Sequence, residues 1–74
     1  MGVGLKIKKY IEENNIQQNS LSIASGIEAP KLNLALNEKR RLRFEEYEIL
    51  CYCLGVGVDK FLAPRKPSKK EKRV

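Results

Sequence analysis

Apolar residues in this chain recur three and four positions apart, which is the spacing of one face of an α-helix. Near the start, Ile7 and Ile11 stand four apart among lysines and glutamates, so their side chains share one helix face. We therefore predict a first helix over 5–14, preceded by a short lead-in over 1–4, with these two isoleucines turned toward a core.

The middle of the chain has two such stretches, separated by one glycine. The apolar positions at helical spacing are Leu21 and Ala24 before it, and Leu32, Ala35 and Leu36 after it. Gly26 stands between them, and glycine adopts positive φ without steric cost, so it suits the end of a helix. We predict one helix from 17 or 18 to 25 and another over 28–37, joined by a tight turn, with Ile27 packed in the angle between them.

The last apolar stretch follows a basic segment. Its inner positions stand three, four and seven apart and are Tyr47, Leu50, Cys51 and Leu54. We predict a fourth helix over 44–54 that ends at Gly55, and a short fifth helix over 58–62 that closes the core. The pattern therefore predicts an all-α fold, a compact five-helix domain over 1–64.

The chain has 74 residues, which is room for one domain with a small core. Its net charge of +6 favours an anionic partner, but the charge is unevenly distributed. Residues 1–64 contain nine Lys and Arg against eight Asp and Glu, whereas residues 65–74 contain six against one. Because residues 65–74 lack apolar periodicity, we predict a disordered basic tail, which either contacts phosphates or serves as a solubilising end.

The residue types that most metal and catalytic sites require are scarce. Histidine is absent, and Cys51 and Cys53 have no second pair of ligands to complete a zinc site. We therefore predict no metal, no cofactor and no enzymatic activity, and we expect Cys51 to be a small buried hydrophobic residue. The free thiols, the lack of a signal peptide and the short apolar runs favour a cytoplasmic protein that does not cross a membrane.

The ordered set of residues from Gln18 onward resembles the lambda-repressor-like helix-turn-helix family, the Cro and repressor proteins also called the Xre type. The matching residues of the central unit are Gln18, Leu21, Ser22, Gly26, Ile27, Leu32, Leu36, Asn37, Glu38, Lys39 and Arg40. The resemblance covers about residues 3–62 and includes Glu46, Tyr47, Leu50, Leu54, Gly55, Val56, Val58, Asp59, Phe61 and Leu62. It implies a domain that binds double-stranded DNA.

The resemblance also implies which residues contact DNA. The helix over 28–37 would enter the major groove, Gln18 would hold a phosphate, and the basic segment 37–43 would lie on the DNA backbone. The candidate DNA contacts are Gln18, Glu28, Ala29, Lys31, Asn33, Leu34, Asn37, Lys39, Arg40, Arg41 and Arg43.

The chain departs from the family pattern at the start of the helix over 28–37. Family members have Ser or Thr there, followed by polar residues that read base edges, whereas this chain has Glu28, Ala29, Pro30 and Lys31. The Glu28 carboxylate suits the helix dipole and repels phosphate. Leu34 lies about 200° round from Leu32, so we expect it to be partly exposed. Three roles for Leu34 stay open: contact with a thymine methyl, contact with a partner protein, or core packing.

Two further departures concern the loop and the core. Glu38 stands where the family has glycine, and a glutamate at positive φ is strained, so we expect the loop to take a different turn. Ile11 and Leu36 stand about where several relatives have an Arg and Glu pair, and we expect both to be core residues.

Two functions from different classes fit this sequence. The first is a sequence-specific, repressor-like transcriptional regulator of phage or mobile-element type that binds double-stranded DNA, with a possible homodimer through the C-terminal helices. The second is a helix-turn-helix fold used as a protein-binding module, an antirepressor or adaptor, with its partner at the Leu34 face.

Overall fold

The computed structural model describes residues 2–62 of the chain. These residues form four helices and no strand: α1 (Val3–Glu13), α2 (Gln18–Ser25), α3 (Ala29–Leu36) and α4 (Phe44–Leu54). The all-α prediction is confirmed, and each of the first four predicted helices is found within two residues of its predicted bounds. The predicted tail over 65–74 lies outside the described residues.

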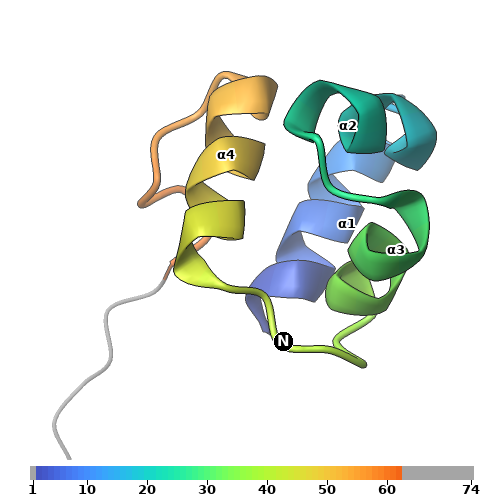
Figure 1. Ribbon diagram of the computed structural model, residues 1–74. Coiled ribbons are helices and arrows are strands. Elements are labelled where there is room, and N and C mark those ends of the chain that lie inside the picture. The colour runs from blue at the N-terminus through green and yellow to red at the C-terminus, as the bar shows by residue number, and fades with distance from the viewer. Residues whose placement is uncertain (1, 63–74) are drawn as a thin grey trace, which may run out of the picture.

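The helices enclose one small core. α2 packs against α3 and α4, and α1 packs against α3. In Figure 1, α4 lies on one side of the molecule and α1 and α3 lie on the other, with α2 beside the C-terminal end of α4. The buried side chains that meet in the core are Ile7, Ile11, Leu21, Ile27, Leu32, Leu36, Tyr47, Leu50, Cys51 and Phe61. The core roles predicted for Ile11, Leu36 and Cys51 are therefore confirmed.

The inner face of α2 differs from the hydrophobic pattern at one position. Ala24 is exposed, and Ser22 is buried in its place. The Ser22 hydroxyl donates a hydrogen bond of 2.5 Å to the Ile27 carbonyl, so this buried polar group is satisfied and it ties α2 to the turn that follows.

The start of α1 lies two residues before its predicted position, because Val3 and Gly4 belong to the helix. Gly4 is buried, and a Cβ atom at this position would overlap the Ala35 carbonyl oxygen. The missing side chain therefore lets the backbone of α1 approach the last turn of α3.

A residue with positive φ follows each of the four helices. These residues are Asn15 (φ 54°), Gly26 (φ 79°), Glu38 (φ 58°) and Gly55 (φ 72°). After α3, the Lys39 N–H donates to the Leu34 carbonyl at 2.8 Å, and the Glu38 N–H donates to the Ala35 carbonyl at 3.1 Å. This pair of bonds is the Schellman arrangement, which satisfies carbonyls that the end of a helix would leave unpaired.

The predicted fifth helix over 58–62 is not found in the described part of the chain. Turns take its place, in which the Lys60 N–H donates to the Gly57 carbonyl at 3.1 Å and the Leu62 N–H donates to the Asp59 carbonyl at 3.3 Å. Both bonds span three residues, and an α-helix requires bonds that span four. Phe61 is still buried against the core, as the apolar pattern predicted.

Tyr47 attaches these turns to α4. Its hydroxyl donates a hydrogen bond to the Val58 carbonyl. Burial raises the pKa of Tyr47 to about 12, so the hydroxyl keeps its proton at neutral pH. Within residues 2–62, none of the helices combines the length and the apolar character that a membrane span requires.

Candidate nucleic-acid interface

α3 has one buried face and one exposed face. Its buried side chains are Leu32, Ala35 and Leu36, and its exposed ones are Ala29, Pro30, Lys31, Asn33 and Leu34. At about 100° per residue, Pro30, Leu34 and Asn37 all lie within about 40° of the direction opposite Leu32. Leu34 is 44% exposed, which confirms the expected partial exposure. The centre of the outward face of α3 is therefore apolar at Pro30 and Leu34.

Polar side chains border this apolar line. Asn33 lies on one side of it and Lys31 on the other, and both are exposed. The Lys31 ammonium is 4.0 Å from the Glu28 carboxylate, and both side chains are more than half exposed, so this ion pair is weak. Glu28 is the N-cap residue of α3 and makes no side-chain capping bond. Its exposed carboxylate therefore lies at the start of α3, with the weak Lys31 pair as its charged partner.

Asn37, a predicted DNA contact, is held within the protein. The Lys8 ammonium of α1 donates to the Asn37 Oδ1 atom at 2.8 Å. The Asn37 Nδ2 atom donates in turn to the Asn33 carbonyl at 2.9 Å. Both polar atoms of this amide are thus engaged, and the side chain fixes the end of α3 to α1.

Glu38 has the positive φ that favours glycine, at 58°. The expectation that the loop would take a different turn here is therefore wrong. Its Oε2 atom accepts a hydrogen bond of 3.3 Å from the Leu5 N–H, in the first turn of α1, where amide groups lack partners within their own helix. A carboxylate also suits the positive end of the helix dipole. These interactions offset the strain of the backbone at Glu38.

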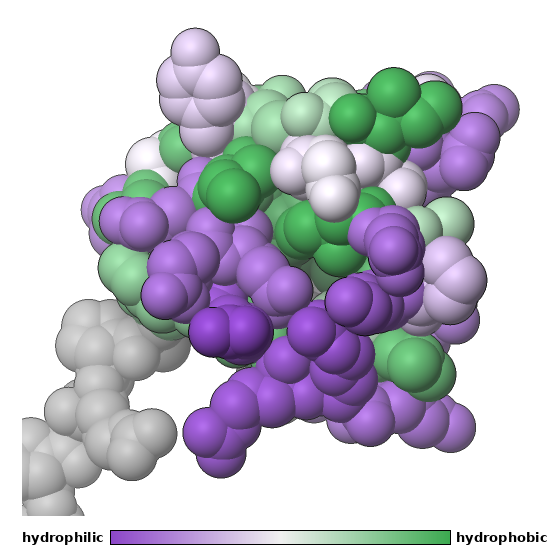
Figure 2. Space-filling model, in the orientation of Figure 1, coloured by the Kyte–Doolittle hydropathy of each residue, from purple (hydrophilic) through white to green (hydrophobic). Residues whose placement is uncertain are grey.

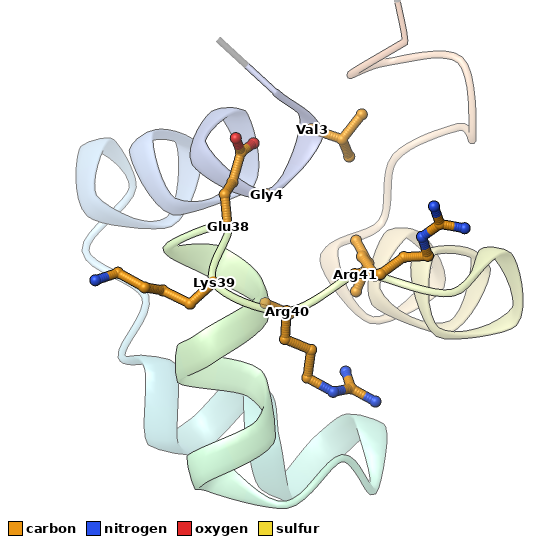
Figure 3. Close-up of a pocket in the computed structure, with 8 residues that line it drawn as sticks. Val3, Gly4, Glu38, Lys39, Arg40 and Arg41 are labelled. Carbon is orange, nitrogen blue, oxygen red and sulfur yellow. The ribbon is translucent and has the colours of Figure 1, made fainter.

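The first turn of α1 leaves space for that carboxylate. A Cβ atom at Gly2 would overlap the Glu38 carboxylate, and a Cβ atom at Gly4 would approach the Glu38 side chain as well as Ala35. Figure 3 shows the Glu38 carboxylate directed toward this turn of α1. A glutamate can therefore stand at the turn because glycines stand opposite it.

Arg40 is paired with Glu46, at the start of α4. Its two terminal nitrogens donate to the two carboxylate oxygens at 3.2 and 3.3 Å. Glu46 also accepts a bond of 3.0 Å from the Arg43 N–H, which satisfies an amide at the start of α4. The pKa of Glu46 is lowered below its ordinary value, chiefly by the hydrogen bond from the Arg43 amide and to a smaller extent by the Arg40 guanidinium. The Arg40 side chain is thus engaged in fixing the loop to α4.

The other three cations of the loop are exposed. Lys39, Arg41 and Arg43 all have exposed side chains, and Figure 3 shows Lys39, Arg40 and Arg41 diverging from the loop. An open depression of about 410 Å³ lies beside them, lined by Val3, Gly4, Ala35, Glu38, Lys39, Arg40, Arg41 and Leu42. In Figure 2, hydrophilic groups gather at the lower edge, where the loop runs in Figure 1, and apolar groups lie higher, between α4 and α2.

Gln18 is the first residue of α2 and is partly exposed. The N-cap residue Gln17 makes no side-chain capping bond, so no side chain caps the first amides of this helix. Amide groups at the start of a helix are suited to hold a phosphate oxygen. The position of Gln18 is therefore compatible with the phosphate contact that the resemblance implies.

Two residues that shape this surface are absent from the sequence-based set. Lys8 reaches Asn37 across 29 positions of the chain, and no local pattern signals such a contact. Glu46 stands three residues after the N-cap Arg43, which is the spacing of half a capping box. This spacing is the signal in the sequence that could have indicated the capping role of Glu46.

This arrangement defines a helix-turn-helix protein: two eight-residue helices are joined at a glycine, the second has an exposed face, and a basic loop follows it. The family model for the Cro/C1-type HTH DNA-binding domain matches residues 6–65, and the chain belongs to this family. The resemblance drawn from the sequence is thereby confirmed, and the domain is of a DNA-binding type. Comparison with curated proteins and with solved structures gave no match.

Proposed function

We propose that this protein is a sequence-specific transcriptional regulator that acts as a repressor by occupying an operator in double-stranded DNA. The observation that carries the proposal is the exposed face of α3, followed directly by the three exposed cations Lys39, Arg41 and Arg43. α3 enters the major groove, while the cations and Gln18 hold phosphates and set the register. No catalytic role is part of this proposal.

We propose a regulator of phage or mobile-element type that binds as a homodimer through its C-terminal end, where Val58 and Leu62 are exposed. A dimer of this kind requires a palindromic operator with half-sites about 34 Å apart. In this proposal residues 1–64 form the DNA-binding domain and residues 65–74 add phosphate contacts.

The decisive experiment is selection from genomic DNA. The full chain is mixed with fragments of the source genome at physiological salt, and the bound fragments are sequenced. We expect enrichment of a short palindrome, bound far more tightly than the roughly 10⁻⁴ to 10⁻⁶ M that is typical of non-specific binding. A set of recovered fragments with no shared site would refute the regulator.

Two neighbouring arginines give a matched test of the phosphate contacts. Arg41 is exposed, whereas Arg40 is paired with Glu46. We expect Arg41→Ala to reduce the slope of log affinity against log salt by about one and to leave stability unchanged, because a phosphate contact releases about one counterion. Arg40→Ala should instead lower stability by about 1 kcal/mol, because Glu46 loses its partner. Equal salt slopes for Arg41→Ala and the unmodified protein would contradict the assignment of Arg41.

One observation favours a second function, a protein-binding module. The centre of the α3 face is apolar at Pro30 and Leu34, and the exposed Glu28 carboxylate repels phosphate. A protein-binding module should show weak, salt-sensitive and non-specific DNA binding in the selection experiment. Replacing Glu28 by Gln should raise affinity several-fold for a DNA-binding regulator, and leave the weak binding of a module almost unchanged.

A further inference from the structure

The outward face of α3 has almost no hydrogen-bonding capacity along its centre. Pro30 has no N–H group, Leu34 is apolar, and the Asn37 amide is bound to the Lys8 ammonium and to the Asn33 carbonyl. Leu34 is 44% exposed, so it is the largest apolar group that this part of the helix offers to a ligand. A ligand that contacts the centre of this face must therefore present an apolar group there.

The floor of the DNA major groove offers one such group. Every base edge there presents polar donors or acceptors, and thymine alone among the four bases adds an apolar C5-methyl group. A leucine placed against an amino or carbonyl group removes water from it and supplies no hydrogen bond in return, which is unfavourable. A leucine placed against a methyl group buries apolar surface on both sides, which is favourable.

The surroundings of Leu34 favour DNA over a protein as the occupant of this face. Lys31 and Asn33 border the leucine, and the exposed cations Lys39, Arg41 and Arg43 follow within one loop. A narrow apolar line with Lys31 on one side, Asn33 on the other and three exposed cations in the following loop matches a polyanion that carries methyl groups on its groove floor. Stable protein partners usually bury about 800 Å² on each side, with apolar and aromatic residues at the centre of the contact.

We propose that Leu34 is the residue that makes this protein select a thymine in each half-site of its operator, through contact with the C5-methyl group. The inference rests on the proposed function, because it assigns a specificity-determining role within the same DNA-binding face. Of the three roles that the sequence left open for Leu34, it commits to contact with a thymine methyl group. An A·T pair is required at the position opposite this side chain, and a G·C pair is disfavoured there.

The test removes one methyl group at a time from the DNA. In the operator recovered by genomic selection, each thymine is replaced singly by deoxyuridine, which retains all hydrogen-bonding groups and lacks only the C5-methyl. We expect one thymine in each half-site whose replacement weakens binding of the unmodified protein by about three- to fivefold, the effect of one buried methyl group. Affinity is measured by fluorescence anisotropy at fixed salt.

Two variants connect that effect to Leu34. Leu34→Ala should bind the thymine and the deoxyuridine operators with affinities within about 1.5-fold of each other, since the side chain that contacts the methyl group is gone. Ile49→Ala is the matched control, because Ile49 on α4 is 43% exposed, close to the 44% of Leu34. The control should keep the full three- to fivefold preference. The deoxyuridine scan on the unmodified protein needs no variant to fold, and circular dichroism reports the folding of both variants.

Several results would overturn the proposal. If no deoxyuridine replacement changes the affinity of the unmodified protein by more than about 1.5-fold, no methyl group is read. If Leu34→Ala keeps the preference, another side chain reads the methyl group. If the selection recovers no site at all, the proposed function and this inference both fail, whereas a well-defined site without methyl dependence removes the inference alone.

Discussion

The two turns on either side of α3 show two ways to reverse a chain. Between α2 and α3 the left-handed residue is Gly26, and between α3 and α4 it is Glu38. A Cβ atom at Gly26 would have open space around it, so this turn needs only the conformational freedom of glycine and hydrogen bonds with the adjacent Ser22 and Ser25. At Glu38 the backbone is less favourable, and a hydrogen bond to the Leu5 N–H offsets the cost. The first turn is specified locally, and the second is specified by contacts with α1.

This difference has a consequence for how substitutions act. A change at Gly26 should affect stability through the conformation of one residue. A change at Glu38 should depend on residues that are distant in sequence, above all Gly2 and Gly4, because they form the space that the glutamate occupies.

The largest effect is expected for Gly4→Ala. The added methyl group would overlap the Ala35 carbonyl oxygen, which is backbone and cannot rotate away, so α1 and α3 must separate. We expect a loss of about 3 kcal/mol in the free energy of unfolding, measured by urea denaturation. A loss below about 1 kcal/mol would show that the start of α1 shifts freely and that the second turn does not depend on it.

Gly26→Ala should cost about 1 kcal/mol. An alanine in the left-handed region is strained, which destabilises the fold. Part of this loss is offset because the unfolded chain of the alanine variant has less conformational entropy. Because the position is open, no steric contact adds to it. Thermal denaturation of the purified variant gives the measurement, and a cost above about 3 kcal/mol would mean that the turn is packed against other residues after all.

Glu38 permits a direct comparison of strain and capping. Glu38→Ala loses the Leu5 hydrogen bond and keeps the strained backbone, so we expect a loss of about 1 kcal/mol. Glu38→Gly loses the same bond but relieves the strain, so its stability should lie within about 0.5 kcal/mol of the unmodified protein. If the two variants were equally stable, φ at this position would carry no cost.

Gly2→Ala provides a partner for that comparison. Its methyl group would displace the Glu38 carboxylate, whose flexible side chain can move aside. The double variant Gly2→Ala with Glu38→Ala should therefore be more stable than the sum of the two single effects predicts. Additive effects in this double-mutant cycle would indicate that Glu38 does not cap α1.

The smallest effect concerns pH. The pKa of Glu46 lies below its ordinary value of 4.5, chiefly because its carboxylate accepts the Arg43 N–H and secondly because it pairs with Arg40. A carboxyl group with a lowered pKa stabilises the fold above the pKa of the unfolded chain, and this contribution is lost as the pH falls through the pKa of the folded protein. We expect Glu46→Gln to flatten the fall in stability below pH 4.5, when compared with the unmodified protein. If stability against pH fell in parallel for the two proteins, Glu46 would not be the group that causes the loss of stability in acid.

The two turns also show what the sequence can specify. The four helices, most of the core and the turn at Gly26 follow from spacing and from glycine, which are local signals, whereas the same spacing wrongly predicted a fifth helix over 58–62. The expectation of a different turn at Glu38 was wrong, because the sequence indicates the strain of a glutamate at positive φ and not the distant contact that offsets it. The pairing of Arg40 with Glu46 and of Lys8 with Asn37 depends on tertiary packing in the same way. For the candidate site, the sequence predicted which side chains are exposed on α3, but not which of the nearby polar groups are already engaged.

The unequal lengths of the helices have a consequence for dynamics. α2 and α3 have eight residues each, and within residues 2–62 no side chain accepts a hydrogen bond from the amides at their starts. α1 and α4 have eleven residues each, and Glu38 and Glu46 accept hydrogen bonds from amides at their starts. Short helices without such bonds open at little cost, so amide hydrogens in α2 and α3 should exchange with deuterium faster than those in the middle of α1 and α4. Binding at the starts of α2 and α3 would supply the missing acceptors, so exchange in these two helices should slow in the presence of an operator. The surface proposed to meet DNA is then also the part of the fold that a ligand would order most.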